Sequence, residues 1–232
     1  MELNQEIKDK IYFVIPAYNE SKVIGDVLCE LIDLGYNNII VVDDGSSDNT
    51  YQIVSNYDVV CLRHVINRGQ GAALKTGIDY AIKKDDCEYI CTFDSDGQHR
   101  ISDLKGMIKP LLNDECEIVL GSRFLKRESK KLVPLKKRIL LKGSIFITMI
   151  LSRIKLTDTH NGYRVMKKSA AKKIDINFDG FEHASEIIDE ISRKKLDYKE
   201  VPVHIDYTEY SKQKGQKIRN AIRILIKMIL NK

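Results

Sequence analysis

The sequence predicts an α/β protein with a mostly parallel sheet flanked by helices. Two observations support this fold class. Short apolar runs of strand length alternate with amphipathic segments of helix length up to about residue 123, and the connections between them are short. Polar clusters rich in Gly, Asn, Asp and Ser follow directly after the apolar runs. In parallel sheets the carboxyl ends of the strands meet at one edge, where ligands bind.

The expected elements follow in chain order. Up to residue 123 we expect strands at 10–17, 38–44, 59–65, 89–94 and 117–122, and helices at 21–34, 71–84 and 101–112. Helical spacing of apolar residues supports the first helix, and Gly35 can end it. Later segments are an apolar amphipathic stretch at 139–154, a loop and strand at 158–166, a helix at 182–194, a strand at 198–207 and a basic amphipathic tail helix. We expect one domain over 1–210, divided at about residue 123 into halves 10–123 and 124–210, with the tail at 211–232.

Composition and charge narrow the class of protein. The chain has 232 residues, 43% hydrophobic and 31% charged, with neither a signal peptide nor an apolar run long enough to span a membrane. Five scattered cysteines indicate reduced thiols in a cytoplasmic protein and make a zinc site improbable.

Basic residues gather in two stretches, with eight at 126–142 and seven at 212–232, while the remaining chain carries 23 basic and 32 acidic residues. This asymmetry favours an anionic membrane surface as partner. Nucleic acid is not expected, because aromatic residues do not interleave the lysines.

Two acidic turns carry the candidate chemistry. In "CTFDSDGQHR", Asp94 and Asp96 follow an apolar strand one residue apart, and two carboxylates that close repel unless a cation lies between them. The surrounding spacing does not fit an EF-hand, which leaves either a solvated turn or a Mg²⁺ or Mn²⁺ site completed by substrate phosphates. In "VVDDGSSDNT", residues 46–49 fit turn and capping roles, whereas Asp44 could accept hydrogen bonds from a ribose or a base.

Six motifs in order resemble those of family 2 glycosyltransferases with the GT-A fold. They are "VIPAYNE", "VVDDGSSDNT", "NRGQGAALKTG", "FDSDGQH", "GSR" and "DTHNGYRVM". Their form is similar to that of dolichyl-phosphate and polyprenyl-phosphate sugar transferases and of bacterial surface-polysaccharide transferases. The resemblance covers about residues 10 to 205.

The resemblance implies roles for individual residues. Asp94 and Asp96 match the motif that binds a divalent metal on the nucleotide diphosphate, and Gln98 matches a residue that joins that metal shell. The residues matching the nucleotide-binding positions are Pro16, Tyr18, Glu20, Asp44 and Arg68. Arg123 and Arg164 match arginines that meet phosphate or acceptor. Gln70 stands where many relatives have lysine, and "FEHASE" at 181–186 departs from the more acidic segment usual there.

These assignments predict a Mg²⁺- or Mn²⁺-dependent, inverting glycosyltransferase at the inner face of the membrane. It would move a sugar from a UDP or GDP donor to a lipid-linked acceptor, with polyprenyl phosphate expected. The catalytic set would be Asp96, Arg123, Asp158 and Arg164. If the acceptor were a sugar hydroxyl, a carboxylate base would be needed, and Asp158 or Glu186 could serve. A non-catalytic nucleotide-sugar-binding protein is the alternative from another class. His99 could reach the diphosphate or the metal, and His160 could shape the acceptor loop.

Overall fold

The computed structural model describes residues 3–125, 154–159 and 161–206. The basic stretch at 126–142, nearly all of the apolar stretch at 139–154, His160 and the tail at 211–232 therefore lie outside the described residues. In the described part of the chain, no helix is both long enough and apolar enough to cross a membrane.

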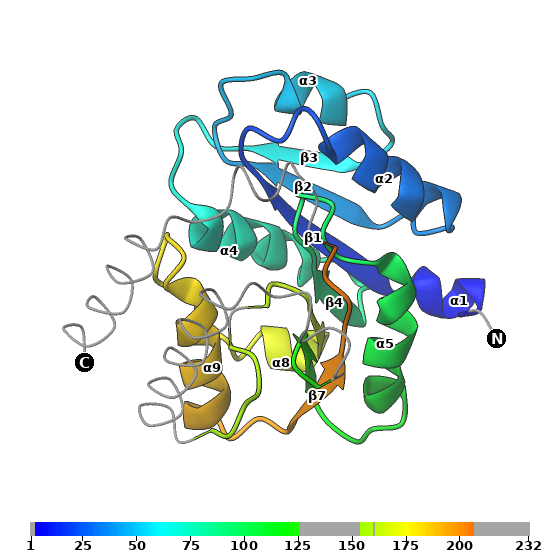
Figure 1. Ribbon diagram of the computed structural model, residues 1–232, viewed down its shortest axis with the longest axis vertical. Coiled ribbons are helices and arrows are strands. Elements are labelled where there is room, and N and C mark those ends of the chain that lie inside the picture. The colour runs from blue at the N-terminus through cyan, green and yellow to red at the C-terminus, as the bar shows by residue number, and fades with distance from the viewer. Residues whose placement is uncertain (1–2, 126–153, 160, 207–232) are drawn as a thin grey trace.

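A seven-stranded, mostly parallel sheet forms the centre of the fold, in the order β3-β2-β1-β4-β6-β5-β7 (Figure 1). Only β6 runs antiparallel to its neighbours among the described strands, and it lies between β4 and β5. The strands are β1 (Ile11–Ala17), β2 (Ile39–Asp43), β3 (Val60–Arg63), β4 (Tyr89–Thr92), β5 (Ile118–Ser122), β6 (Arg164–Lys167) and β7 (Tyr198–Pro202). The predicted fold class and the first five predicted strands are thus confirmed.

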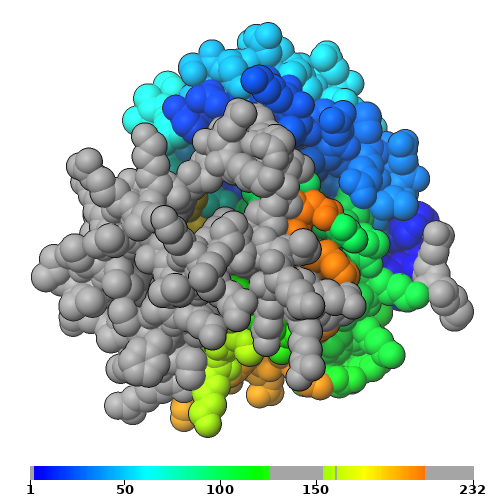
Figure 2. Space-filling view, in the orientation of Figure 1, coloured from blue at the N-terminus to red at the C-terminus, as the bar shows by residue number. Residues whose placement is uncertain are grey.

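Helices cover both faces of the sheet (Figure 1). Alternate residues of β1 point to opposite faces, so Phe13 packs with α2, α3 and α5, while Val14 packs with α4, α8 and α9. The helices are α1 (Gln5–Lys8), α2 (Ile24–Asp33), α3 (Thr50–Val54), α4 (Gln70–Ala81), η1 (Ile101–Asp103), α5 (Leu104–Leu112), α8 (Lys168–Ala171) and α9 (His183–Arg193). The short η1 is a 3₁₀ turn that leads into α5. In the space-filling view, the blue-to-cyan N-terminal residues form the upper part of the molecule (Figure 2).

The register of β6 brings together two distant parts of the chain. Arg164 lies opposite Thr92 at the end of β4 and opposite Leu120 near the end of β5. Because β6 is antiparallel, its first residue meets the carboxyl ends of its neighbours. The acids that follow β4 and the arginine that begins β6 therefore share one edge of the sheet.

Three differences from the sequence prediction have physical reasons. The strand predicted at 59–65 ends at Arg63, because the chain then turns to bring the amides of Arg68 and Gly69 to the carboxylate of Asp44. The strand predicted at 198–207 ends at Pro202; beyond it, within the described residues, the chain leaves β5 and Ile205 forms an isolated bridge with His99. The short helices α1 and α8 were not expected, since four residues give little periodicity to read.

Candidate active site

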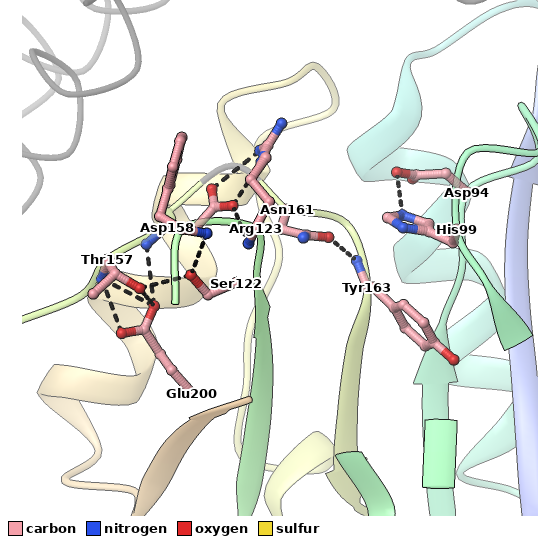
Figure 3. A network of polar contacts seen from close by, with 10 residues as sticks. Asp94, His99, Ser122, Arg123, Thr157, Asp158, Asn161, Tyr163 and Glu200 are labelled. Carbon is pink, nitrogen blue, oxygen red and sulfur yellow. Dashed lines mark hydrogen bonds and ion pairs between the residues drawn. The ribbon is translucent and has the colours of Figure 1, made fainter. Parts of the chain in front are cut away.

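Asp94 is held in place by two side chains and by the backbone at Gly162. Its Oδ2 accepts a hydrogen bond from Nε2 of His99 at 2.9 Å (Figure 3). Its Oδ1 accepts one from Nε2 of Gln70 at 3.1 Å. On another side lies Gly162, where an added Cβ would be 2.5 Å from both carboxylate oxygens. Any side chain at 162 would therefore displace the carboxylate of Asp94.

His99 is itself fixed by aromatic packing. Its ring centroid lies 5.4 Å from that of Phe93 and 5.0 Å from that of Tyr163, and all three residues are buried. These contacts orient the imidazole so that Nε2 faces Asp94. The structure thus places His99 beside the first acid of the Asp-x-Asp turn, and its reach to a diphosphate or a metal stays a prediction.

Asp96 lies on the same turn, supported by Gln98. The backbone N–H of Gln98 donates to Oδ1 of Asp96 at 3.1 Å, and the side-chain amide donates to Oδ2 at 2.5 Å. The negative charges of Asp94 and Glu20 both act on Asp96. The predicted residues Asp94, Asp96, Gln98 and Glu20 are therefore brought together, although Glu20 comes from the loop after β1.

The pKa values of the two acids of this turn shift in opposite directions. Burial and the charge of Asp94 raise the pKa of Asp96 to about 6. Burial also pushes the pKa of Asp94 upward, but the hydrogen bond and charge of His99, together with the charge of Arg164, outweigh it and lower the pKa. Asp94 is thus the stable anion of the pair, and Asp96 is the acid that gains most from a nearby cation.

The donor atoms at this turn fit a hard divalent cation. Two carboxylates and an amide supply oxygen ligands, which Mg²⁺ and Mn²⁺ prefer. Within the described ranges, no group of three or more His, Cys, Asp or Glu side chains is arranged to hold a metal by itself. An ion bound by Asp94 and Asp96 would therefore take further ligands from substrate phosphates and water, as is usual for Mg²⁺.

Asp44 organises the loop between β3 and α4. Its buried carboxylate accepts hydrogen bonds from the backbone N–H groups of Arg68 at 3.0 Å and Gly69 at 2.7 Å, and from Nδ1 of His64 at 2.7 Å. The predicted nucleotide residues Asp44 and Arg68 are therefore adjacent. In this conformation the carboxylate of Asp44 positions the loop.

The remaining residues of the predicted nucleotide pocket lie at the end of β1. Pro16 is a buried strand residue opposite Val42 of β2. Tyr18 follows with an exposed side chain, and the backbone N–H of Glu20 donates to Oγ1 of Thr50 at 2.8 Å. Pro16 therefore shapes the strand end, and the side chain of Tyr18 reaches the surface beside it.

Arg123 and Asp158 form a buried ion pair at the end of β5 (Figure 3). Asp158 accepts three hydrogen bonds from Arg123: from Nε at 2.6 Å, from Nη2 at 3.0 Å and from the backbone N–H at 3.2 Å. Glu200 on β7 secures this segment by accepting hydrogen bonds from the backbone N–H groups of Thr157 at 2.9 Å and Asp158 at 3.1 Å. Burial raises the pKa of Glu200. Sequence reasoning found Arg123 and Asp158 but missed both their pairing and Glu200.

Arg164 is buried, and the charges of two acids, Asp94 and Asp158, act on it. Burial lowers its pKa to about 10, and the charges of Asp94 and Asp158 oppose that change. Among the described residues, Nη1 of Arg164 and the nearby Nδ2 of Asn161 are buried donors without a hydrogen-bond partner. Buried donors are rarely left unpaired, so these two would favour an oxygen-rich ligand such as a phosphate. Sequence reasoning missed Asn161, whose only signal was its place in "DTHNGYRVM".

His183 begins α9 close to this arginine. Burial and the charge of Arg164 lower its pKa to about 4. The ring is therefore neutral at pH 7, and its Nδ1–H donates to the carbonyl of Gly180 at 2.8 Å. A neutral imidazole here leaves Arg164 as the cation beside Asp94.

The loop before α9 packs on the amino terminus of α4. The carbonyl of Asp179 accepts hydrogen bonds from the N–H groups of Gly71 at 2.8 Å and Ala72 at 3.2 Å. Gly71 permits this approach, because an added Cβ would lie 2.0 Å from the carbonyl oxygen of Phe178. Glu186, the second candidate base, accepts hydrogen bonds from the N–H groups of Asn177 and Phe178 and so anchors this loop.

Comparison with known proteins identifies the family. The family described as "Glycosyl transferase family 2" matches residues 12–175. A UDP-N-acetylglucosamine–dolichyl-phosphate N-acetylglucosaminyltransferase from Methanococcus voltae is 36% identical over 241 residues, covering 96% of each chain. A dolichol-phosphate mannosyltransferase from Pyrococcus furiosus is 27% identical over 95% of this chain and 64% of its own.

Solved structures support the fold. Glucosyl-3-phosphoglycerate synthase from Mycobacterium tuberculosis, in complex with Mn²⁺ and UDP-glucose, superposes with a TM-score of 0.68 at 16% identity, covering 99% of this chain and 82% of that one. The fold is therefore GT-A, and the motifs at the carboxyl edge of the sheet match a family of known chemistry. The chain belongs to glycosyl transferase family 2 and is a glycosyltransferase.

Proposed function

We propose that this glycosyltransferase moves a sugar from a nucleotide-diphosphate donor, UDP-linked or GDP-linked, to polyprenyl phosphate, with inversion at the anomeric carbon and with Mg²⁺ or Mn²⁺. The observation that carries the proposal is the near full-length similarity to a dolichyl-phosphate transferase. The site supports it, since the charge of the buried Arg164 acts on Asp94, and Asp94 lies on the same turn as Asp96.

The transfer is a single displacement. A phosphate oxygen of the acceptor forms a bond to the anomeric carbon while the bond from that carbon to the donor diphosphate breaks. The electron pair leaves with the diphosphate, so negative charge grows there. A divalent ion held by Asp94, Asp96 and Gln98 would neutralise that charge, an effect of several kcal/mol in such sites.

The chain's own residues orient the reacting groups. His99, Gln70 and Gly162 fix the carboxylate of Asp94 from three directions, so it need not reorganise when a ligand binds. Nη1 of Arg164 and Nδ2 of Asn161 offer buried donors to a phosphate oxygen. If both donors bound the same phosphate, they would restrict its orientation before bond formation.

The hydrogen bonds that Asp158 accepts from Arg123 favour a phosphate acceptor over a sugar hydroxyl. A hydroxyl must lose its proton to a base, whereas a phosphate oxygen is already anionic. Both oxygens of Asp158 accept hydrogen bonds from Arg123, and Glu186 anchors a loop. Neither carboxylate is placed as a base in this conformation. Asp158 is then a positioning residue for Arg123.

We further propose that the enzyme is peripheral at the inner, cytoplasmic face of the membrane, where the polyprenyl phosphate would lie. The support is the dolichyl-phosphate acceptor in the relative's name and the basic stretches of the sequence. An anionic membrane surface would be the second partner.

A panel of nucleotide sugars, each with and without polyprenyl phosphate and each with Mn²⁺ or excess chelator, tests the proposal. Labelled lipid product should form with one donor and disappear with chelator. Asp96→Asn should lower turnover by about 100-fold or more, whereas Asp33→Asn on the exposed end of α2 should not. Transfer to a free sugar hydroxyl but not to the lipid phosphate would refute the acceptor assignment, and full activity in chelator would refute the metal role.

A further inference from the structure

Exposed apolar side chains gather at the edge of the sheet that holds the acids. The described residues include eight large apolar side chains that are exposed, and six of them lie on loops at this edge: Tyr18, Val65, Ile66, Leu125, Phe178 and Phe181. The other two, Leu34 and Leu112, lie at the ends of α2 and α5, toward the opposite edge. Such clustering is unusual on a monomer surface and marks an interaction site.

Four of these residues form a surface that we call the apolar rim, made of Val65, Ile66, Phe178 and Phe181. Their exposed fractions are 98%, 69%, 37% and 48%. The cyan segment after β3, which carries the first two, reaches the surface at the upper left of Figure 2. Val65 and Ile66 follow His64 in the loop after β3, and their exposure shows that they do not pack in the core.

The two loops of the apolar rim meet although they are far apart in sequence. Nη2 of Arg68 lies 3.3 Å from the carboxylate of Asp179, a partner 111 residues away. The carbonyl of Asp179 also caps α4, one residue from Gln70, which donates to Asp94. The apolar rim therefore borders the site itself.

Both loops are held rigidly, so the exposure is built into the fold. Asp44 accepts hydrogen bonds from the N–H groups of Arg68 and Gly69, just after Ile66, and Nε2 of His64 lies 2.9 Å from Oγ1 of Thr76, just before Val65. On the other loop, Glu186 accepts the N–H of Phe178 at 3.0 Å. These contacts fix the backbone on both sides of Val65 and Ile66 and at Phe178.

The charges beside the apolar rim indicate its partner. Arg63 and Arg68 bracket Val65 and Ile66 in the sequence, and their side chains are 45% and 52% exposed in ion pairs with Asp43 and Asp179. An apolar tip between two arginines suits the boundary of a lipid bilayer, where apolar groups enter the acyl region and guanidinium groups lie at the phosphates.

We propose that the apolar rim docks on a lipid bilayer and turns the carboxyl edge of the sheet toward the headgroups. This inference rests on the proposed function, because a polyprenyl phosphate presents its phosphate at that depth. It differs from the sequence-based expectation, which placed membrane contact on the basic stretches at 126–142 and 212–232. The rim would bring the acceptor phosphate to the side of the site where Gln70 and Asp94 lie.

Tryptophan insertion gives a direct test, because the chain contains no tryptophan. In the full chain, Val65→Trp should show blue-shifted emission with vesicles of phosphatidylcholine and phosphatidylglycerol, and quenching by lipids brominated on the acyl chain. Leu34→Trp, at the opposite edge, is the matched control and should show neither change. Unchanged emission from Val65→Trp, or equal quenching of both variants, would overturn the proposal.

Removal of the apolar side chains gives the second readout. The double variant Val65→Ser, Ile66→Ser should bind these vesicles about tenfold more weakly, since each side chain loses part of its transfer free energy. Leu34→Ser, Leu112→Ser is the control with two exposed apolar residues removed elsewhere. Unchanged vesicle binding, together with loss of a dimer in sedimentation, would show that a second copy of this chain covers the rim instead.

Transfer assays separate failure of this proposal from failure of the proposed function. The serine double variant should lose transfer to polyprenyl phosphate in vesicles but retain it with a short-chain, water-soluble prenyl phosphate. If the wild type glycosylates neither acceptor but still inserts at Val65, the proposed function fails and the docking surface stands. If vesicle transfer by the double variant equals that of the wild type, the docking surface fails alone.

Discussion

Replacement of Asp158 by Asn separates a positioning role from a catalytic base. The carboxylate accepts three hydrogen bonds from Arg123, and the side chains of Arg123 and Asp158 are 9% and 0% exposed. Removing one partner of a buried ion pair costs about 3–5 kcal/mol, because the other charge is left uncompensated. Asn keeps one acceptor oxygen, so we expect a loss near the lower end.

A loss of about 3 kcal/mol lowers the melting temperature of a chain of this size by roughly 6–12 °C. Asp175→Asn is the matched control, since Asp175 forms only exposed ion pairs, with Arg193 at 3.9 Å and Lys194 at 3.7 Å. Exposed pairs contribute about 0–1 kcal/mol, so the control should melt within a few degrees of the wild type. Adding Arg123→Met to Asp158→Asn should restore part of the lost stability, because the uncompensated charge is removed.

The opposite pattern would refute this reasoning. If Asp158→Asn melts with the wild type but loses more than about 100-fold in turnover, Asp158 acts as a general base. In that case a sugar hydroxyl would become the better acceptor. Thermal melts and turnover measured on the same preparations distinguish the two roles.

Three further predictions concern the acidic turn. Asp96→Asn should stabilise the metal-free enzyme by about 1–2 kcal/mol at pH 7, because ionising Asp96 against its raised pKa of about 6 is unfavourable. The gain should shrink as the pH falls below 6 and vanish below the ordinary pKa of 3.8, where folded and unfolded Asp96 are both protonated. An undiminished gain at about pH 3 would contradict this. Mn²⁺ at 100 times its Kd should raise the free energy of unfolding of the wild type by about 2.7 kcal/mol, seen as a higher melting temperature. An equal rise in Asp96→Asn would exclude Asp96 as a ligand. Gly162→Ala should weaken Mn²⁺ binding and turnover, since its Cβ would lie 2.5 Å from both oxygens of Asp94; normal Mn²⁺ titration of that variant would argue against the tight fit.

Local sequence patterns were sufficient for the fold class and for the acids at the strand ends. A buried strand followed by a polar turn is visible in a short window, so Asp44 and the Asp94–Asp96 turn were placed correctly at the carboxyl edge. The neighbours of those acids were also near in sequence, as with His99 and Gln98.

Contacts between distant segments were not predictable in this way. Nothing near Arg123 indicates that Asp158 would pair with it, and the antiparallel insertion of β6 depends on pairing across the whole sheet. Val65 illustrates the same limit. Its β-branched side chain extends the strand pattern. However, Asp44, which follows β2, accepts hydrogen bonds from the N–H groups of Arg68 and Gly69, and the segment that carries Val65 is exposed.

The antiparallel insertion of β6 has a consequence for how this enzyme can diversify. The backbone of Arg164 is paired with strands on both sides, so its Cα cannot move along the sheet without slipping the register of both pairs. A descendant that accepts a different lipid or sugar would have to change its loops while inheriting this cation unchanged. The position of Arg164 in the sheet is thus set by three strands together, whereas the loops at the same edge can change one at a time.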